Sequence, residues 1–314
     1  MSRLRTILLA VATVSIVAHP ATLLAQSVVV DFSSDPRVPR GNDPLFTLRG
    51  PGAAQFVYEP ASAPRFPGDS RGSLAVTYDS LKPTSRLFTM LPEGLTQDDD
   101  FIFGAVLTIR PEGFAADPFG FHPIAFSLFN SATTGDDRTG DLTDFSADTF
   151  DTAEFAYFPN ISPIFGGPFL SPDLFGESIA PDAFAGFAYG SIPFELRSGV
   201  TYLVELEHSA SLRTLTAQVW LVRADGRAAP LAGGRVEVNL SGITGFLVDS
   251  LGIPAYHDGF NEFAASGRSL LATVDYDLLY CARGRDGRLS AALNRALARL
   301  KRPAHVTSIS VPAR

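Results

Sequence analysis

The sequence predicts an all-β protein, a two-sheet antiparallel jelly-roll sandwich followed by a short C-terminal amphipathic helix. Three features predict it: many short runs of alternating apolar and polar residues, turn-forming Pro and Gly between them, and almost no helical periodicity before residue 288. The length favours a large jelly roll over an immunoglobulin-type domain of about 100 residues. Twenty-five Phe against two Met and one Trp indicate a rigid, Phe-packed core.

The N-terminus has the features of a secretory signal peptide. Arg3 and Arg5 precede an apolar run over 7–17, and small residues come before the expected cleavage site after Ala25. We therefore expect residues 1–25 to be removed and the mature protein to be secreted or held in the cell envelope. An N-terminal membrane anchor is the alternative, but the run is short for a membrane span, and no later stretch is long and apolar enough.

Charge divides the rest of the chain into two parts. Residues 281–314 carry eight Lys and Arg against one Asp, whereas residues 27–280 are strongly acidic. No Ser/Gly linker interrupts 27–280, so we expect one sandwich domain there and a basic helical tail over 281–314. An acidic body argues against nucleic acid as a partner and fits a neutral glycan, a cation or simple solubility. The single Cys281 excludes an intrachain disulfide.

The expected strands are short and separated by turns or loops. In chain order they cover 27–32, 46–48, 55–58, 73–78, 84–91, 101–109, 124–130, 152–158, 184–189, 201–208, 214–221, 236–240, 245–253 and 269–280. Two longer segments, 131–145 and 159–181, are rich in Asp, Thr, Gly or Pro and are expected to be loops.

The two runs within 201–222 predict an antiparallel hairpin. Even-numbered residues of the first run and odd-numbered residues of the second are mostly apolar. A four-residue loop at 209–212 would set Thr201 opposite Trp220 and place both apolar sets on the core face. Trp220 is then expected to point away from the core.

The last strand and the tail differ in periodicity. In the strand, even-numbered residues from Leu270 to Leu278 are expected to complete the core. Beyond Gly287 the period changes to about 3.6, which predicts a helix over 288–302. Its apolar side carries Leu289, Leu293, Leu297 and Leu300. A basic amphipathic helix suits an anionic membrane or the acidic body itself; a shifted reading frame would also give an Ala/Arg-rich end. Four Leu are marginal for stable docking, so the tail is not expected to be part of the fold.

Several segments resemble the concanavalin A-like lectin and glucanase superfamily. Tyr202-Leu-Val-Glu-Leu-Glu followed by Leu215-Thr-Ala-Gln-Val resembles the back-sheet hairpin of these domains. The further segments are Val248-Asp-Ser-Leu-Gly-Ile before Tyr256 and Asp258, Ala272-Thr-Val-Asp275, and Glu154-Phe-Ala-Tyr-Phe-Pro-Asn160. They are similar to exported bacterial proteins of the superfamily, many of unknown function. The resemblance implies a fold and an extracellular location, and no activity.

Glycoside hydrolysis needs two carboxyl groups on either side of the scissile bond. The resemblance to glucanases would make Glu154 the first, with a helper and an acid two and four residues later, where Ala156 and Phe158 stand. We therefore expect a non-catalytic binding or structural protein, with glycan as the candidate partner. A polysaccharide hydrolase or lyase of the same fold is the alternative, which a second carboxylate beside Glu154 in a concave groove would favour.

The polar face of the hairpin supplies a candidate glycan site. An aromatic ring flanked by hydrogen-bonding groups suits a sugar. The candidate residues are Trp220, Gln218, Thr216 and Glu205, together with Glu154. An ordinary solvent face, or a loop that covers Trp220, would give the same pattern.

Four aspartates in one loop form a candidate calcium site. They are Asp136, Asp137, Asp141 and Asp144. Calcium prefers six to eight oxygen ligands, but the spacing is not that of an EF-hand, and a solvated acidic loop is the alternative. Zinc is not expected, because the histidines of the mature chain form no spaced pair and Cys281 is alone. His208 has the core-facing parity and is expected to be neutral.

Overall fold

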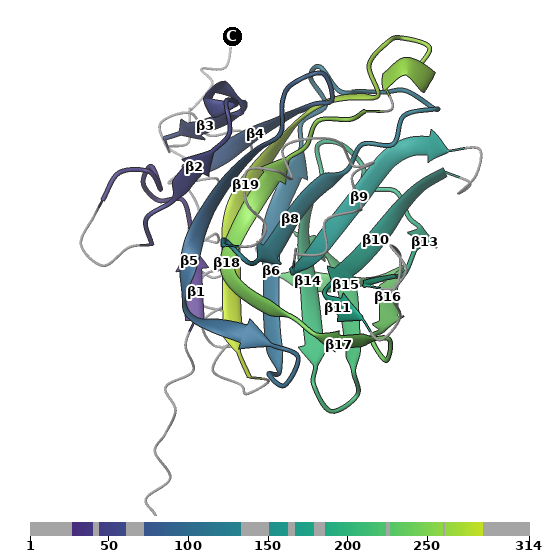
Figure 1. Cartoon of the computed structure of the whole chain (residues 1–314). Helices are drawn as coiled ribbons and strands as arrows, with labels where there is room; N and C mark the ends of the chain where they lie inside the picture. Colours follow the sequence, from purple (N-terminus) through teal and green to yellow (C-terminus); the bar gives the residue numbers. More distant parts are fainter. Residues whose placement is uncertain are drawn as a thin grey trace, which may run out of the picture.

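Two large antiparallel sheets lie face to face and enclose the core (Figure 1). The computed structural model describes residues 27–39, 44–60, 72–132, 151–162, 167–178, 186–223, 227–259 and 261–284. The expected signal peptide, the Asp-rich loop and the helix over 288–302 lie outside these residues. The fold class predicted from the sequence, an antiparallel two-sheet jelly-roll sandwich, is confirmed. No helix of the described part is long and apolar enough to cross a membrane.

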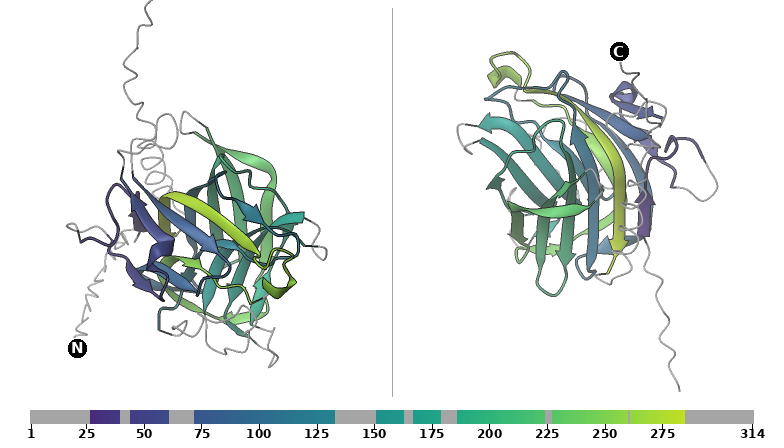
Figure 2. Two further views of the ribbon diagram at one scale, coloured as in Figure 1. Left: turned by 90° about the horizontal axis from the view of Figure 1, so that it is seen from above. Right: turned by 180° about the vertical axis from the view of Figure 1, so that it is seen from behind.

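Sheet A contains the hairpin and the last strand. Its strand order is β16 (Ala228–Asn239), β15 (Thr214–Val222), β14 (Thr201–Ser209), β6 (Phe101–Ile109), β19 (Leu270–Arg283), β4 (Ser73–Asp79) and β3 (Phe56–Glu59). Two further strands pair with β19: β1 (Ser27–Val30) and β7 (Ala115–Ala116). In the view from behind, β19 runs along much of the height of the sandwich (Figure 2).

Sheet B faces sheet A across the core. Its strand order is β12 (Phe187–Tyr189), β10 (Gly167–Phe175), β9 (Thr152–Ser162), β8 (Ile124–Phe129), β18 (Leu247–Ala255), β5 (Ser85–Thr96) and β2 (Thr47–Arg49), with β13 (Ile192–Pro193) beside β10. The remaining elements are the pair β11 (Glu177–Ser178) and β17 (Ile243–Gly245) and the 3-10 turns η1 (Ala53–Gln55) and η3 (Asn261–Phe263).

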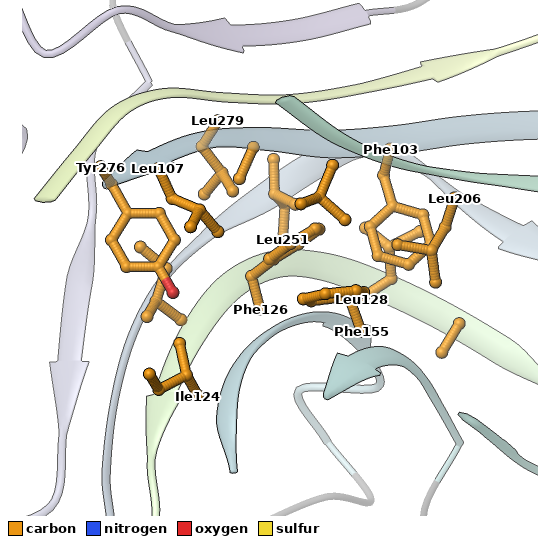
Figure 3. Close-up of a cluster of buried hydrophobic side chains, with 14 of the residues drawn as sticks. Phe103, Leu107, Ile124, Phe126, Leu128, Phe155, Leu206, Leu251, Tyr276 and Leu279 are labelled. Atoms are coloured by element: carbon orange, nitrogen blue, oxygen red, sulfur yellow. The ribbon is translucent and has the colours of Figure 1, made fainter. Parts of the chain in front are cut away.

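The core is packed with aromatic rings, as the composition predicts. Phe126 of sheet B lies between Phe103 of sheet A and Phe155 of the neighbouring strand (Figure 3). The ring centroids are 5.9 Å apart for Phe103 and Phe126, edge to face, and 5.3 Å apart for Phe126 and Phe155, which stack. Aromatic pairs of this geometry stabilise beyond the area they bury.

The hairpin prediction is right in its faces and wrong in its register. Tyr202 lies opposite Leu221 and Glu205 opposite Gln218, which is two residues away from the expected pairing, and the loop is 210–213. The ladder extends past His208, whose Nδ1 contacts the carbonyl oxygen of Asp99 at 2.7 Å. A slip of two residues keeps every side chain on its face, so Trp220 points away from the core as expected.

The last strand departs from its prediction at a bulge. Its register against β6 shifts between Tyr276 and Leu278, which adds one residue and inverts the alternation. Beyond the bulge Leu279 and Cys281 face the core, whereas Leu278 lies on the outer face. The even-numbered face therefore completes the core only as far as Tyr276. The strand also continues to Arg283, beyond the expected end at residue 280.

Candidate functional site

The outer face of sheet B carries two carboxylates side by side. Glu154 of β9 and Asp173 of β10 are direct cross-strand partners. Their side chains share the face opposite the core, because the alternating residues Ala153, Phe155 and Leu174 belong to the core. Antiparallel partners have Cα atoms about 5 Å apart, so the two carboxyl groups are near neighbours. Both are almost buried, with exposed fractions of 5% and 7%.

Each carboxylate accepts a hydrogen bond from a neighbouring hydroxyl. The Tyr256 hydroxyl donates to Glu154 Oε2 at 2.5 Å, and the Ser171 hydroxyl donates to Asp173 Oδ1 at 2.7 Å. Tyr256 follows the end of β18, and Ser171 lies two residues before Asp173 on the same face of β10. Hydrogen bonds of this kind fix the orientation of the accepting carboxyl group.

An aromatic row leads from these carboxylates to the edge of the sheet. Tyr189 of β12 is the other cross-strand partner of Asp173, so its ring stands on the same face. Phe175, Phe187 and Tyr189 stack in sequence, with centroids 4.3 Å and 5.1 Å apart. Tyr189 is 56% exposed. We call Tyr189, Asp173 and Glu154 the edge site, since they join an accessible ring to two acceptor groups.

Small residues continue the same face away from the edge site. Ser127 lies opposite Glu154, and Gly252 lies opposite Ser127. A side chain at Gly252 would meet the Cβ atom of Phe88 at 2.7 Å, so the rings beside it leave room only for glycine. The space over Gly252 is therefore filled by neighbouring atoms.

Two arginines stand on the far side of the face. Arg49 of β2 and Arg86 of β5 are cross-strand partners. The Arg86 guanidinium lies 5.4 Å from the centroid of Phe129, and that of Arg49 lies 5.1 Å from the centroid of Phe88. Cation–π contacts hold both groups against the sheet. The face thus has carboxylates at one side and guanidinium groups at the other.

The structure separates the ligand-binding residues predicted from the sequence. Glu154 lies on the outer face of sheet B, whereas Thr216, Gln218, Trp220 and Glu205 lie on the outer face of sheet A. The two faces are on opposite sides of the sandwich, so these five residues cannot form a single site.

The hairpin face is less polar than the sequence suggests. Trp220 is half-buried beside Leu203 in an apolar cluster, and its indole nitrogen is buried without a hydrogen-bond partner. Glu205 accepts a hydrogen bond from the Tyr280 hydroxyl at 2.7 Å. Burial raises the pKa of Glu205, which this hydrogen bond opposes. Sugar binding at Trp220 stays a prediction.

The candidate calcium ligands Asp136, Asp137, Asp141 and Asp144 lie outside the described residues, so calcium binding stays a prediction. Within the described ranges, no group of three or more His, Cys, Asp or Glu is placed to hold a metal ion. His208 is buried and stacks on Phe101 at 4.7 Å, in the core-facing position that its parity predicts.

Asp173 and Tyr189 were missed as site residues for different reasons. Asp173 falls within 159–181, where frequent Pro and Gly predict a loop. The strand β10 forms there, and Pro172 is tolerated because its backbone faces the side of β12, whose ladder covers only residues 173–175; the Pro172 carbonyl accepts from the Gly190 N–H, and no N–H of residue 172 is needed. Alternation of Phe169, Ser171 and Asp173 with Leu170 and Leu174 was the signal that could have revealed it. Tyr189 was expected in a strand, but nothing in the sequence pairs it with Asp173.

Comparison with known proteins finds similarity of fold only. No protein-family model and no curated protein sequence matches the chain. Solved structures with a similar fold include the carbohydrate recognition domain of Emp47p, at 14% identity and a TM-score of 0.48, over 83% of this chain and 96% of that one.

Two legume lectins are similar to the same extent. Peanut lectin with a nonapeptide has 13% identity, a TM-score of 0.43 and coverage of 83% and 98%. The winged bean acidic lectin with methyl-α-D-galactose has 13% identity, a TM-score of 0.45 and coverage of 83% and 100%. These proteins are concanavalin A-like jelly-roll lectins, the superfamily that the sequence resembles. At these identities the likeness concerns the fold alone.

Proposed function

We propose that the protein is an exported, non-catalytic glycan-binding protein of the cell envelope or the extracellular space, and that the edge site holds the sugar. One observation carries the proposal: the exposed ring of Tyr189 is the cross-strand partner of Asp173, which is the partner of Glu154. The export signal expected at residues 1–25 supports the location.

The chemistry of the three side chains suits a pyranose ring. The C–H face of a sugar packs on an aromatic ring, and its hydroxyl groups donate to carboxylate oxygens. A site of one apolar platform and a few polar groups that set orientation is typical of small-ligand recognition. The acidic character of the chain favours a neutral glycan over an anionic one.

Replacing Tyr189 with alanine is expected to weaken glycan binding about 30-fold, which corresponds to about 2 kcal/mol for an aromatic anchor. The protein is first screened on an array of oligosaccharides, and the best ligand is then titrated by calorimetry. Asp173→Asn keeps the size of the side chain and removes its charge, and should weaken binding through the hydroxyl contacts.

Phe263→Ala is the matched control, because Phe263 in η3 is an aromatic residue of similar exposure, 59% against 56%. It should bind as the unaltered chain does. Equal affinity in all three variants, or no saccharide bound across the array, would refute the edge site as a glycan site.

The carboxylate pair also favours a second candidate, a polysaccharide hydrolase. A retaining hydrolase needs one ionised carboxylate and one protonated carboxyl about 5 Å apart. Here a hydroxyl orients each carboxyl group, because Tyr256 donates to Glu154 Oε2 and Ser171 donates to Asp173 Oδ1. We rank binding above hydrolysis because the exposed ring of Tyr189 beside the pair suits a bound sugar. Release of reducing ends from a bound oligosaccharide, lost in Glu154→Gln, would reverse that order.

A further inference from the structure

The outer face of sheet A carries an apolar cluster that is covered. Its buried members are Val106, Leu203, Leu278, Tyr280 and Ala282, and Val29, Ile102, Trp220, Val222 and Ala228 pack against them. The five buried residues are between 0% and 3% exposed, although all of them point away from the core. We call these ten residues the outer cluster.

This burial does not arise from the sheet alone. One face of an antiparallel sheet packs on the core, and the other normally remains in contact with water. Every described residue of the outer cluster belongs to a strand of sheet A itself. Gly104 is the cross-strand partner of both Glu205 and Tyr280. A Cβ atom at Gly104 would meet the Tyr280 hydroxyl at 2.6 Å, because the Tyr280 ring lies along the sheet over this glycine and donates to Glu205. A second layer is needed above it.

We propose that the C-terminal segment of this chain, residues 285–302, docks on the outer cluster. The segment follows the cluster directly in sequence. Leu278, Tyr280 and Ala282 are outward-facing residues of β19, which is the last described strand and ends at Arg283. Gly284 has a φ of 89°, and its N–H donates to the Asp100 carbonyl, so the chain turns out of the sheet at the rim of the cluster.

The size of the segment fits the cluster. The helix predicted over 288–302 would be about 22 Å long at 1.5 Å per residue. The outer cluster extends over six neighbouring strands, from β16 through β15, β14, β6 and β19 to β1. At about 4.8 Å between strands, this width is about 24 Å. A helix that crosses the strands would place its Leu stripe over the whole cluster.

The charges are complementary. Glu205 and Glu207 of β14 point outward on this face. Residues 285–314 contain seven Lys and Arg against one Asp. Basic side chains flanking the Leu stripe would meet these carboxylates at the rim, where a pair contributes modestly, while the Leu residues supply most of the contact.

The test uses Trp220, which is the single Trp of the chain. In the full chain, Leu293→Asp combined with Leu297→Asp should release the segment, shift Trp emission to longer wavelength and raise acrylamide quenching at least twofold. Ser308→Asp combined with Ser310→Asp adds the same charge outside the Leu stripe, and should leave emission and quenching unchanged.

Three results would overturn the proposal. Emission and quenching that are the same in both variants would show that another layer covers Trp220. If quenching of the unaltered chain decreases as the protein concentration increases, a second copy of the chain covers this face. Quenching that falls only with vesicles of anionic lipid would assign it to a membrane.

Limited tryptic digestion decides the case if the Leu variant does not melt cooperatively. In the unaltered full chain, a docked segment should be cut at Arg288, Arg295 and Arg299 at least tenfold more slowly than in urea-unfolded chain. Equal rates would contradict docking.

Discussion

Replacing Phe126 with alanine is expected to lower the free energy of unfolding by about 4 kcal/mol, the usual cost of removing a fully buried aromatic ring. Phe126 is 0% exposed and contacts rings of both sheets, so the surrounding residues cannot collapse into the space without moving one sheet against the other. In a domain of this size the melting temperature should fall by about 10 °C. Urea titration at equilibrium measures the free energy directly.

Phe119→Ala is the matched control, because this ring is 56% exposed. It should lower the free energy of unfolding by less than about 1 kcal/mol, as surface changes usually do. If Phe126→Ala were as mild as Phe119→Ala, the central position of Phe126 between the two sheets would be wrong.

Local alternation predicts which face a side chain occupies better than it predicts its partner. In the hairpin, Tyr202, Val204 and Leu206 face the core as expected, although the pairing differs by two residues. A slip of two leaves the alternation unchanged, so only contacts outside the hairpin decide the register. The bond between His208 and the Asp99 carbonyl is such a contact, and it is 109 residues away in sequence.

In β19, a single bulge makes the prediction of side-chain faces from alternation fail partway along the strand. The alternation holds from Leu270 to Tyr276 and then inverts, and the residues Asp277, Leu278 and Leu279 give no sign of the insertion. The inversion brings Leu278 and Tyr280 to the outer face. The apolar outer cluster, and with it the reason to dock the tail on the sandwich, was therefore hidden in the sequence.

The candidate site was half predictable for a similar reason. Glu154 stands in a strand with clear alternation, and its outward direction follows from Ala153 and Phe155. Asp173 becomes its neighbour only because β10 pairs with β9, and the sequence does not state the order of strands in a sheet. A second carboxylate thus lies beside Glu154, which is one of the two conditions for a hydrolase of this fold, the other being a concave groove.

Acidification from pH 7 to pH 5 is expected to destabilise the fold through His122. This side chain is 0% exposed, and neither ring nitrogen has a hydrogen-bond partner among the described residues. Burial, with a smaller contribution from the neighbouring His257, lowers the pKa of His122 to about 3. The unfolded imidazole takes up a proton below its ordinary pKa of about 6.5, and the folded one does not, so the unfolded state gains stability as the pH falls. At pH 5 this difference amounts to about 2 kcal/mol.

The contribution of His122 is isolated by comparing its substitution with the unaltered chain at both pH values. Carboxylates with lowered pKa, such as Asp35, Asp99 and Asp117, lose their stabilising contribution mainly below pH 5, and they do so in both proteins. In His122→Gln the side chain no longer titrates, so the fall in the free energy of unfolding between pH 7 and pH 5 should be smaller by about 2 kcal/mol. The comparison does not depend on the absolute cost of the substitution, since each protein is its own reference at pH 7. Parallel pH profiles for the two proteins would mean that His122 exchanges protons in the folded state as freely as in the unfolded one, and that this end of the core is open to water.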